Sequence, residues 1–168
     1  MGRPIYALAM TGETKESAVE RIVSGGQTGA DRAALDVALE LGLACSGWVP
    51  RGRRAEDGPI DRRYPVRETE ETDVAARTRL NVRDSDATLI LTAGELRGGT
   101  ALTARVAAEL GRPLRIADPA TGPGPVRDWL VREEVRVLNV AGPRESEEPG
   151  LQARAAGFLR RLLRGPED

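Results

Sequence analysis

The sequence contains no histidine and a single cysteine, Cys45, among its 168 residues. Without histidine the chain cannot form a Ser-His-Asp triad, a Cys-His pair or a histidine-ligated metal site. One cysteine permits neither an internal disulfide nor a cage of thiolates around zinc, and it fits a reducing compartment. We therefore expect no metal site in this protein.

Aromatic residues and net charge are also scarce: aromatics make up 3% of the chain, and the net charge is −1 at pH 7. Few aromatic side chains leave little surface on which single-stranded nucleic acid could stack. A chain near neutrality has no global field that attracts nucleic acid or an anionic membrane. No apolar run approaches the roughly 20 residues that span a bilayer, and the apolar stretch 5–10 is shorter than the core of a secretory signal. We expect a cytoplasmic protein whose partners include neither nucleic acid nor membrane.

The length is that of one ordinary domain with its own core. Residues 1–18 are expected to form a leader or an added edge strand, and residues 19–168 a single ligand-binding domain. Strand-like segments at 21–24, 44–49, 87–91, 114–117 and 135–140 alternate with helix-like segments at 29–41, 72–83, 126–132 and 151–163 and with one that ends at Leu110. This alternation predicts an α/β fold with three layers, α/β/α, around a mostly parallel sheet of about five strands.

Three glycine-containing turns follow predicted strands, at 24–32, 92–100 and 141–146. Because the carboxyl ends of parallel strands share one edge of a sheet, we expect the three turns to converge on one crevice. Each turn leads toward a helix start, where unpaired N–H groups and the helix dipole favour an anion. The turns therefore predict a site for phosphate, pyrophosphate or another oxyanion. The alternative is three structural turns without a ligand.

The candidate ligand-binding residues of the turns are glycines, hydroxyls, arginines and one acid. They are Gly25, Gly26, Gln27, Thr28, Gly29, Asp31 and Arg32 in the first turn, Gly94, Arg97, Gly98, Gly99 and Thr100 in the second, and Gly142, Arg144 and Ser146 in the third. Arginine offers charge-assisted hydrogen bonds to an oxyanion. Asp31 either favours the helix dipole or holds a sugar hydroxyl or Mg²⁺. The first turn lacks both the G-x-G-x-x-G spacing of the dinucleotide fingerprint and the Gly-Lys-Ser/Thr of a P-loop.

A long segment of prolines, glycines and charged residues spans residues 50–71, after the second predicted strand. A loop of this length inside a compact domain is typically functional or disordered, and this one follows a strand end and could cover the crevice. Its candidate ligand-binding residues are Arg53, Arg54, Glu56 and Asp57. With Arg51, three arginines face two acids, which leaves about one positive charge for an oxyanion. A solvated surface loop is the alternative. Glu56, Asp57 or Glu68 of this loop could also serve as a general acid or base if closure of the loop buried one of them and raised its pKa.

Six stretches carry a resemblance to a known family: 24–36, 47–58, 77–82, 85–90, 98–100 and 138–146. On these residues the chain resembles the molybdenum carrier family, a branch of a Rossmann-like group that includes the lysine-decarboxylase-like phosphoribohydrolases and the nucleotide-binding SLOG sensors. The resemblance extends from about residue 20 to the end of the chain. It implies a Rossmann-like fold and the function of a carrier. The implied ligand is either molybdenum cofactor, a small molecule that bears a phosphate, or molybdate, an oxyanion.

The same resemblance implies two alternatives: an enzyme that cleaves an N-glycosidic bond in a nucleotide, and a SLOG-type nucleotide sensor. The phosphoribohydrolases have a Pro-Gly-Gly-x-Gly-Thr turn followed closely by a glutamate. Here Gly98-Gly99-Thr100 is followed by no acid until Glu109. This difference favours a binding protein over an enzyme and leaves phosphate or nucleotide binding intact. A homo-oligomer is the expected assembly of a small α/β domain.

Overall fold

A five-stranded sheet forms the centre of the computed structural model, which describes residues 17–164. Its strands are β1 (Arg21–Val23), β2 (Ala44–Ser46), β7 (Ala87–Leu91), β8 (Leu114–Ala117) and β9 (Val137–Ala141). They lie in the order β2-β1-β9-β7-β8, and every neighbouring pair is parallel. The predicted parallel sheet of about five strands is confirmed. The leader expected at residues 1–18 falls almost entirely outside the described residues.

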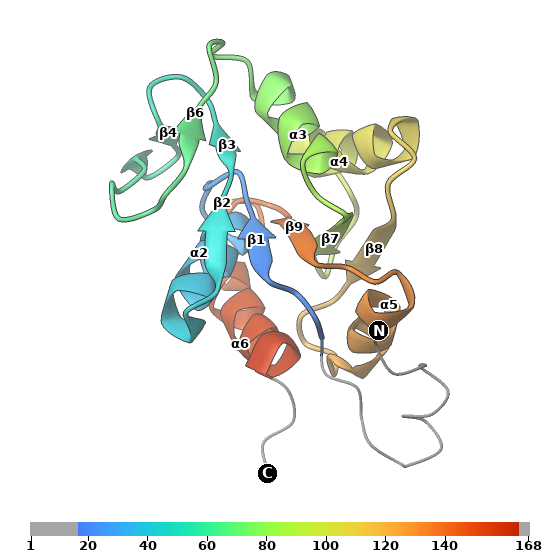
Figure 1. Ribbon diagram of the computed structural model, residues 1–168. Coiled ribbons are helices and arrows are strands. Elements are labelled where there is room, and N and C mark those ends of the chain that lie inside the picture. The colour runs from blue at the N-terminus through green and yellow to red at the C-terminus, as the bar shows by residue number, and fades with distance from the viewer. Residues whose placement is uncertain (1–16, 165–168) are drawn as a thin grey trace, which may run out of the picture.

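Helices cover both faces of the sheet (Figure 1). They are α2 (Ala30–Leu41), α3 (Val74–Arg83), α4 (Gly98–Glu109), α5 (Gly124–Arg132) and α6 (Leu151–Arg164). Helices α2, α5 and α6 lie on one face, and α3 and α4 pack together on the other. The amphipathic sequence of α6 explains its place, because Leu151, Ala155, Phe158 and Leu162 recur at helical spacing and are all buried. The three-layer α/β/α prediction is confirmed.

The strand order identifies where this sheet should bind a ligand. When the strands are numbered one to five in the order β7, β8, β9, β1 and β2, the sheet read from its β8 edge has the order 2-1-3-4-5. This is the strand order of a doubly wound fold. Strand β1 continues through α2 to β2 on one side, whereas β7 continues through α4 to β8 on the other. The two crossovers therefore diverge, with β9 between them. In open α/β sheets ligands bind outside the carboxyl ends of the strands at such a point.

The single strand expected at 44–49 is two strands in different sheets. Strand β2 ends at Ser46, and β3 (Trp48–Val49) pairs with β6 (Arg67–Glu68) outside the central sheet. Gly47 lies between them, where an added Cβ would stand 1.8 Å from the carbonyl oxygen of Ser24. Only glycine lets the chain pass this close to the end of β1. The strand is interrupted there because the backbone must turn away.

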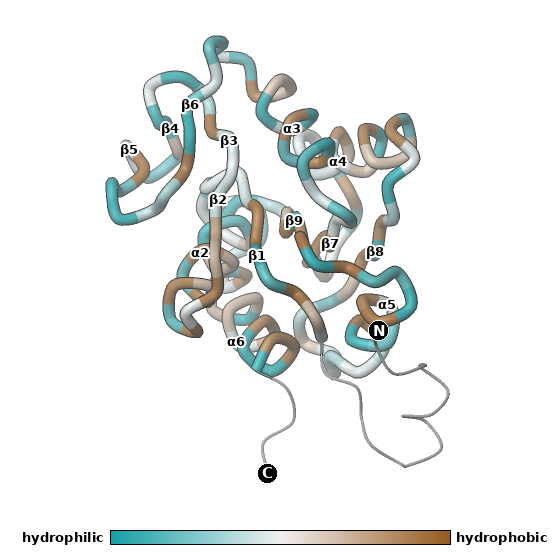
Figure 2. Tube along the Cα trace, in the orientation of Figure 1, coloured by the Kyte–Doolittle hydropathy of each residue, from teal (hydrophilic) through white to brown (hydrophobic). Residues whose placement is uncertain are grey.

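The segment 50–71, expected to be a loop, contains short paired strands. The pair β4 (Arg54–Ala55) and β5 (Gly58–Pro59) forms an antiparallel hairpin, and β6 pairs with β3. Figure 2 shows this segment as mostly hydrophilic, yet Ile60, Tyr64 and Val66 are buried and join the main core. Three apolar anchors spaced along 22 residues thus hold the segment against the domain. We refer to residues 50–71 below as the excursion.

We expect Gly47→Ala to lower the free energy of unfolding by at least about 1–3 kcal/mol, because the new methyl group overlaps the Ser24 carbonyl. Urea denaturation followed by circular dichroism measures the change. Gly122→Ala is the matched control, since a Cβ at Gly122 meets nothing within 4 Å. Equal stability of the two variants would show that the close approach at Gly47 is not obligatory.

Candidate functional site

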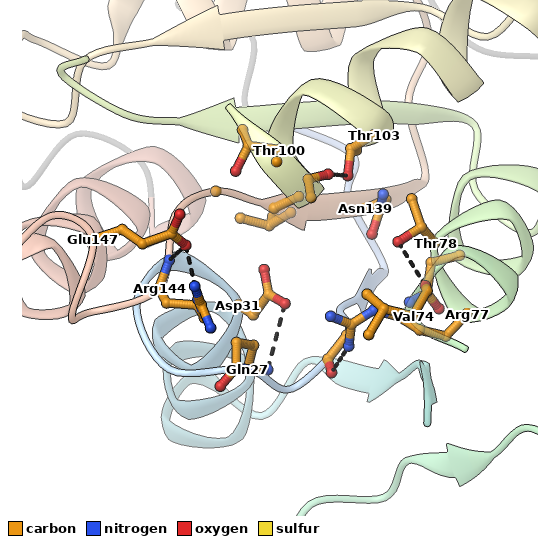
Figure 3. Close-up of a pocket in the computed structure, with 17 residues that line it drawn as sticks. Gln27, Asp31, Val74, Arg77, Thr78, Thr100, Thr103, Asn139, Arg144 and Glu147 are labelled. Atoms are coloured by element: carbon orange, nitrogen blue, oxygen red, sulfur yellow. Dashed lines mark hydrogen bonds and ion pairs between the residues drawn. The ribbon is translucent and has the colours of Figure 1, made fainter. Parts of the chain in front are cut away.

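The three glycine-containing turns surround one cavity at the carboxyl edge of the sheet. Its volume is about 220 Å³, and we call it the glycine-turn pocket (Figure 3). It is lined by Gly25, Gln27 and Asp31 from the first turn, Gly98, Gly99, Thr100 and Thr103 from α4, Gly142, Arg144 and Glu147 after β9, Asn139, Val140 and Ala141 of β9, and Val74, Arg77, Thr78 and Asn81 of α3. Residues more than a hundred positions apart in the sequence therefore share one pocket.

The start of α4 offers free hydrogen-bond donors to this pocket. The residue that precedes the helix, Arg97, makes no side-chain cap, and its carbonyl accepts the N–H groups of Thr100 at 3.0 Å and Ala101 at 3.2 Å. Within residues 17–164 no acceptor is recorded for the N–H groups of Gly98 and Gly99, and both glycines are exposed. Unpaired N–H groups at the positive end of a helix dipole form an anion-binding site.

Gly25 lies between two charged side chains of the pocket. Arg77 of α3 donates through Nη1 to the Gly25 carbonyl oxygen at 2.6 Å. A Cβ on Gly25 would stand 2.6 Å from Arg77 Nη1 and 3.0 Å from Asp31 Oδ2. The absence of a side chain at Gly25 therefore lets α3 reach across to the first turn and brings Arg77 near Asp31.

Asp31 is the pocket residue with the most perturbed protonation. Burial raises the pKa of its carboxyl group to about 6, while Arg77, the backbone N–H of Gln27 and Arg32 oppose the rise. The Gln27 N–H reaches Asp31 Oδ2 at 3.4 Å. A buried carboxyl group with a raised pKa in a pocket is a typical feature of a functional site.

The side chain of Arg32 is fully engaged in hydrogen bonds within the protein and does not line the pocket. Its guanidinium donates to both carboxylate oxygens of Asp57, at 2.9 and 3.1 Å, and to the Gly26 carbonyl oxygen, at 3.0 and 3.1 Å. This hydrogen bonding lowers the pKa of Asp57. The pair fastens the β4–β5 hairpin to the first turn, so both residues position the pocket and do not line it.

Glu56 joins the same hairpin to the first and third turns. Its carboxylate accepts hydrogen bonds from the Thr28 hydroxyl, from the Ser146 N–H at 3.1 Å and from the Ser146 hydroxyl at 2.5 Å. The hydrogen bond from the Ser146 side chain, followed by that from Thr28, lowers the pKa of Glu56. The structure thus contradicts the expectation that loop closure raises the pKa of Glu56 or Asp57, because the pKa values of both carboxyl groups are lowered.

Several other candidates lie outside the pocket lining. Arg53 donates to the carbonyl oxygens of Ile60, Asp61, Tyr64 and Val66 and so holds the excursion together. Arg54 lines a separate open groove with Arg51. Arg97 pairs with Glu95 at 3.6 Å on the surface, and the Gly94 N–H bonds Thr92 Oγ1 at 3.1 Å. Gly29 meets the third turn, where a Cβ would stand 2.2 Å from the Pro143 carbonyl oxygen.

Sequence reasoning missed the contribution of α3 and β9 to the pocket. Neither the helix predicted at 72–83 nor the strand predicted at 135–140 supplied a candidate ligand-binding residue, although Val74, Arg77, Thr78 and Asn81 of α3 line the pocket. Asn81 also holds the Trp48 backbone through both its amide atoms, at 2.7 and 3.0 Å. One signal was available: Asn139 is the polar residue within the otherwise apolar strand β9.

The doubly wound topology, with a polar pocket at the switch point, defines a Rossmann-like domain. The model of the circularly permutated YpsA SLOG family matches residues 22–163, and the chain belongs to that family. The doubly wound strand order appears only when the strands are counted from β7 instead of from the first strand, which agrees with a circular permutation.

The chain is also similar to a solved protein named Putative molybdenum carrier protein, from Syntrophus aciditrophicus SB, whose crystal structure was determined at 1.45 Å. The two are 39% identical, with a TM-score of 0.86 over 89% of this chain and 98% of the other. None of the curated proteins compared with the chain matches it. Between residues 17 and 164, no helix has the length and apolar character to cross a membrane, and no group of three or more His, Cys, Asp or Glu could hold a metal ion.

We expect Asp31→Asn to make the protein more stable above pH 6. The folded state holds a proton on Asp31 up to about pH 6, whereas the unfolded chain releases it near pH 3.8, so stability falls as the pH rises through this window. A difference of about two pKa units corresponds to about 3 kcal/mol. The free energy of unfolding of the variant should exceed that of the wild type by about this amount at pH 7.5, and by much less at pH 3.5. Urea denaturation across this range measures the difference. Asp128→Asn, on the exposed side of α5, is the control; parallel profiles for wild type and Asp31→Asn would contradict the assignment.

Proposed function

We propose that this protein is a carrier that binds a phosphate-bearing small molecule or an oxyanion in the glycine-turn pocket, with molybdenum cofactor or molybdate as the ligand. The observation that carries the proposal is the pair of unpaired N–H groups of Gly98 and Gly99 at the start of α4, on the border of the pocket. The name of the solved relative from Syntrophus aciditrophicus supports molybdenum as the cargo.

The anion would be held at the rim of the pocket. Gly98, Gly99 and Arg144 are exposed lining residues, and Arg144 is paired with Glu147 at 2.9 Å. A phosphate there gains backbone hydrogen bonds without any rearrangement of α4, and Arg144 can add a charge-assisted bond. Ligation of molybdenum by thiolate is not part of the proposal, since Cys45 is buried in β2 and does not line the pocket.

Direct binding measurements separate the carrier from a nucleotide sensor of SLOG type. Purified protein is titrated calorimetrically with molybdenum cofactor, with molybdate and with nucleoside monophosphates. The carrier proposal expects cofactor or molybdate to bind. Binding of nucleotides alone would replace it by the sensor.

We expect Gly99→Val to weaken phosphate-ligand binding by tenfold or more without changing the fold. A Cβ at Gly99 meets nothing within 4 Å in the protein, so the new side chain lies in the space that the anion would use. Isothermal titration calorimetry measures the affinity. Gly157→Val is the matched control, because Gly157 is a helical glycine of α6 with the same open surroundings. Full affinity in the Gly99 variant would show that the α4 start is only structural.

Hydrolysis of an N-glycosidic bond is the second candidate, and Asp31 is the observation that favours it. A carboxyl group with a pKa of about 6 in the pocket can donate a proton to a leaving base. Water would then convert a nucleoside 5′-monophosphate to ribose 5-phosphate and free base. Incubation with nucleoside monophosphates and chromatography for free base tests this. The carrier proposal expects none, and turnover that is lost in Asp31→Asn would establish the enzyme.

Homo-oligomerisation stays a prediction of the sequence. Size-exclusion chromatography with light scattering measures the mass in solution. A mass of 18.0 kDa would identify a monomer and contradict it.

A further inference from the structure

Donors and acceptors occupy different depths of the glycine-turn pocket. The exposed lining residues include the two glycines with unpaired N–H groups and Arg144, so the rim is rich in donors. The most buried polar lining residues are Asn81 and Asn139, at 3% exposure each, followed by Thr103 at 6% and by Asp31, Thr78 and Thr100 at 7% each. Both amide atoms of Asn81 are used by the Trp48 backbone. A carboxylate and an amide oxygen are therefore available at the floor. Both ends of the pocket are therefore polar: Gly98, Gly99 and Arg144 offer donors at the rim, beside the exposed Glu147, and Asp31 and Asn139 offer acceptors at the floor.

Asp31 has unused hydrogen-bonding capacity at this floor. Within residues 17–164 the carboxyl group accepts one hydrogen bond, the 3.4 Å contact from the Gln27 N–H to Oδ2. Its other oxygen accepts no hydrogen bond from these residues, although only 7% of the surface of Asp31 is exposed. Figure 3 shows this side chain pointing into the middle of the cavity. Among the described residues Arg127 Nε is the fully buried side-chain nitrogen or oxygen atom without a partner, so the free Asp31 oxygen is accessible from the cavity. It can therefore accept a hydrogen bond from a ligand there.

Asn139 adds a second acceptor on the same cavity. Its Nδ2 donates to Thr88 Oγ1 at 3.2 Å, and its Oδ1 has no donor among the described residues. The side chain projects from β9, the strand between the two diverging crossovers. Asp31 and Asn139 thus offer unused oxygen atoms from two different elements, which is a built surface for a ligand edge that donates hydrogen bonds.

A simple oxyanion does not use this floor. Asp31 and Glu147 are matched in number by Arg77 and Arg144, so the pocket carries no excess positive charge when Asp31 is ionised. Molybdate or phosphate placed deep in the pocket would meet the Asp31 carboxylate. A ligand with an anion at one end and donors at the other satisfies both the rim and the floor.

We infer that the ligand enters ring first and carries a planar amino-oxo heterocycle, as in guanine or a pterin, whose adjacent N–H groups bond Asp31 and Asn139. The inference rests on the proposed function, since the phosphate at the α4 start fixes the orientation. Asp31 and Asn139 each accept one of these N–H groups, and the hydrogen bond to the Asp31 carboxylate is charge-assisted. Adenine presents a ring nitrogen acceptor where guanine presents an N–H, so it places a lone pair against the carboxylate.

The test uses calorimetric titration of the full chain with GMP, IMP, AMP and inorganic phosphate. GMP should bind at least about tenfold more tightly than AMP, because its two donors complete hydrogen bonds to the Asp31 carboxylate and the Asn139 amide oxygen. IMP lacks the 2-amino group and should fall between them. Asp31→Asn should reduce the affinity for GMP about tenfold and should not reduce that for AMP or phosphate. Asp128→Asn on α5 is the control and should keep the ranking.

The outcomes separate this inference from the proposed function. If phosphate and all three nucleotides bind with equal affinity, the anion site stands and the ring selectivity is overturned. Preference for AMP over GMP overturns it as well. If none of the four probes binds, the ring inference is overturned, whereas the carrier proposal is decided separately by the titrations with molybdenum cofactor and molybdate. The ranking on the unmodified protein decides the matter even if Asp31→Asn does not fold.

Discussion

Backbone segments meet at the carboxyl edge of this sheet at distances that leave no room for a Cβ atom. A side chain would stand 1.8 Å from the Ser24 oxygen at Gly47, 2.2 Å from the Pro143 oxygen at Gly29 and 2.4 Å from the Leu91 oxygen at Gly142. These contacts join the ends of β1, β7 and β9. Glycine is required here for close approach of main chains, and the pocket exists because the turns are drawn together around it.

The β4–β5 hairpin keeps these turns in place through charged side chains. Asp57 binds the guanidinium of Arg32, which also holds the Gly26 carbonyl, and Glu56 binds hydroxyls of Thr28 and Ser146. Each acid thus takes donors from the turns rather than from a ligand. Supporting contacts of this kind preorganise a site, since the groups that face the ligand need not be ordered when it binds.

The sheet, its flanking helices and the convergence of the three turns could be predicted from the sequence, because long apolar runs and glycine-rich strand ends are local signals. The pairing of β4 with β5 could not, since two-residue strands have no periodicity. The different contacts of two neighbouring arginines could not be predicted either. Arg53 donates hydrogen bonds to four carbonyl oxygens, whereas Arg54 lines an open groove. The contacts of these two side chains depend on the path of the backbone through the excursion. The α3 side of the pocket depends in the same way on tertiary packing.

Asp31 shows how local and tertiary rules can conflict in one residue. An acid in the first turn of a helix ordinarily stabilises the helix through its dipole. Here the start of α2 is covered by the glycine-containing turns, so burial dominates and raises the pKa of the carboxyl group to about 6, despite Arg77 nearby. At neutral pH the charged side chain therefore opposes folding. A small apolar or amide residue at this position would avoid that penalty. The fold places this destabilising acid on the floor of its polar pocket, and local violations of this type concentrate where a protein binds or reacts.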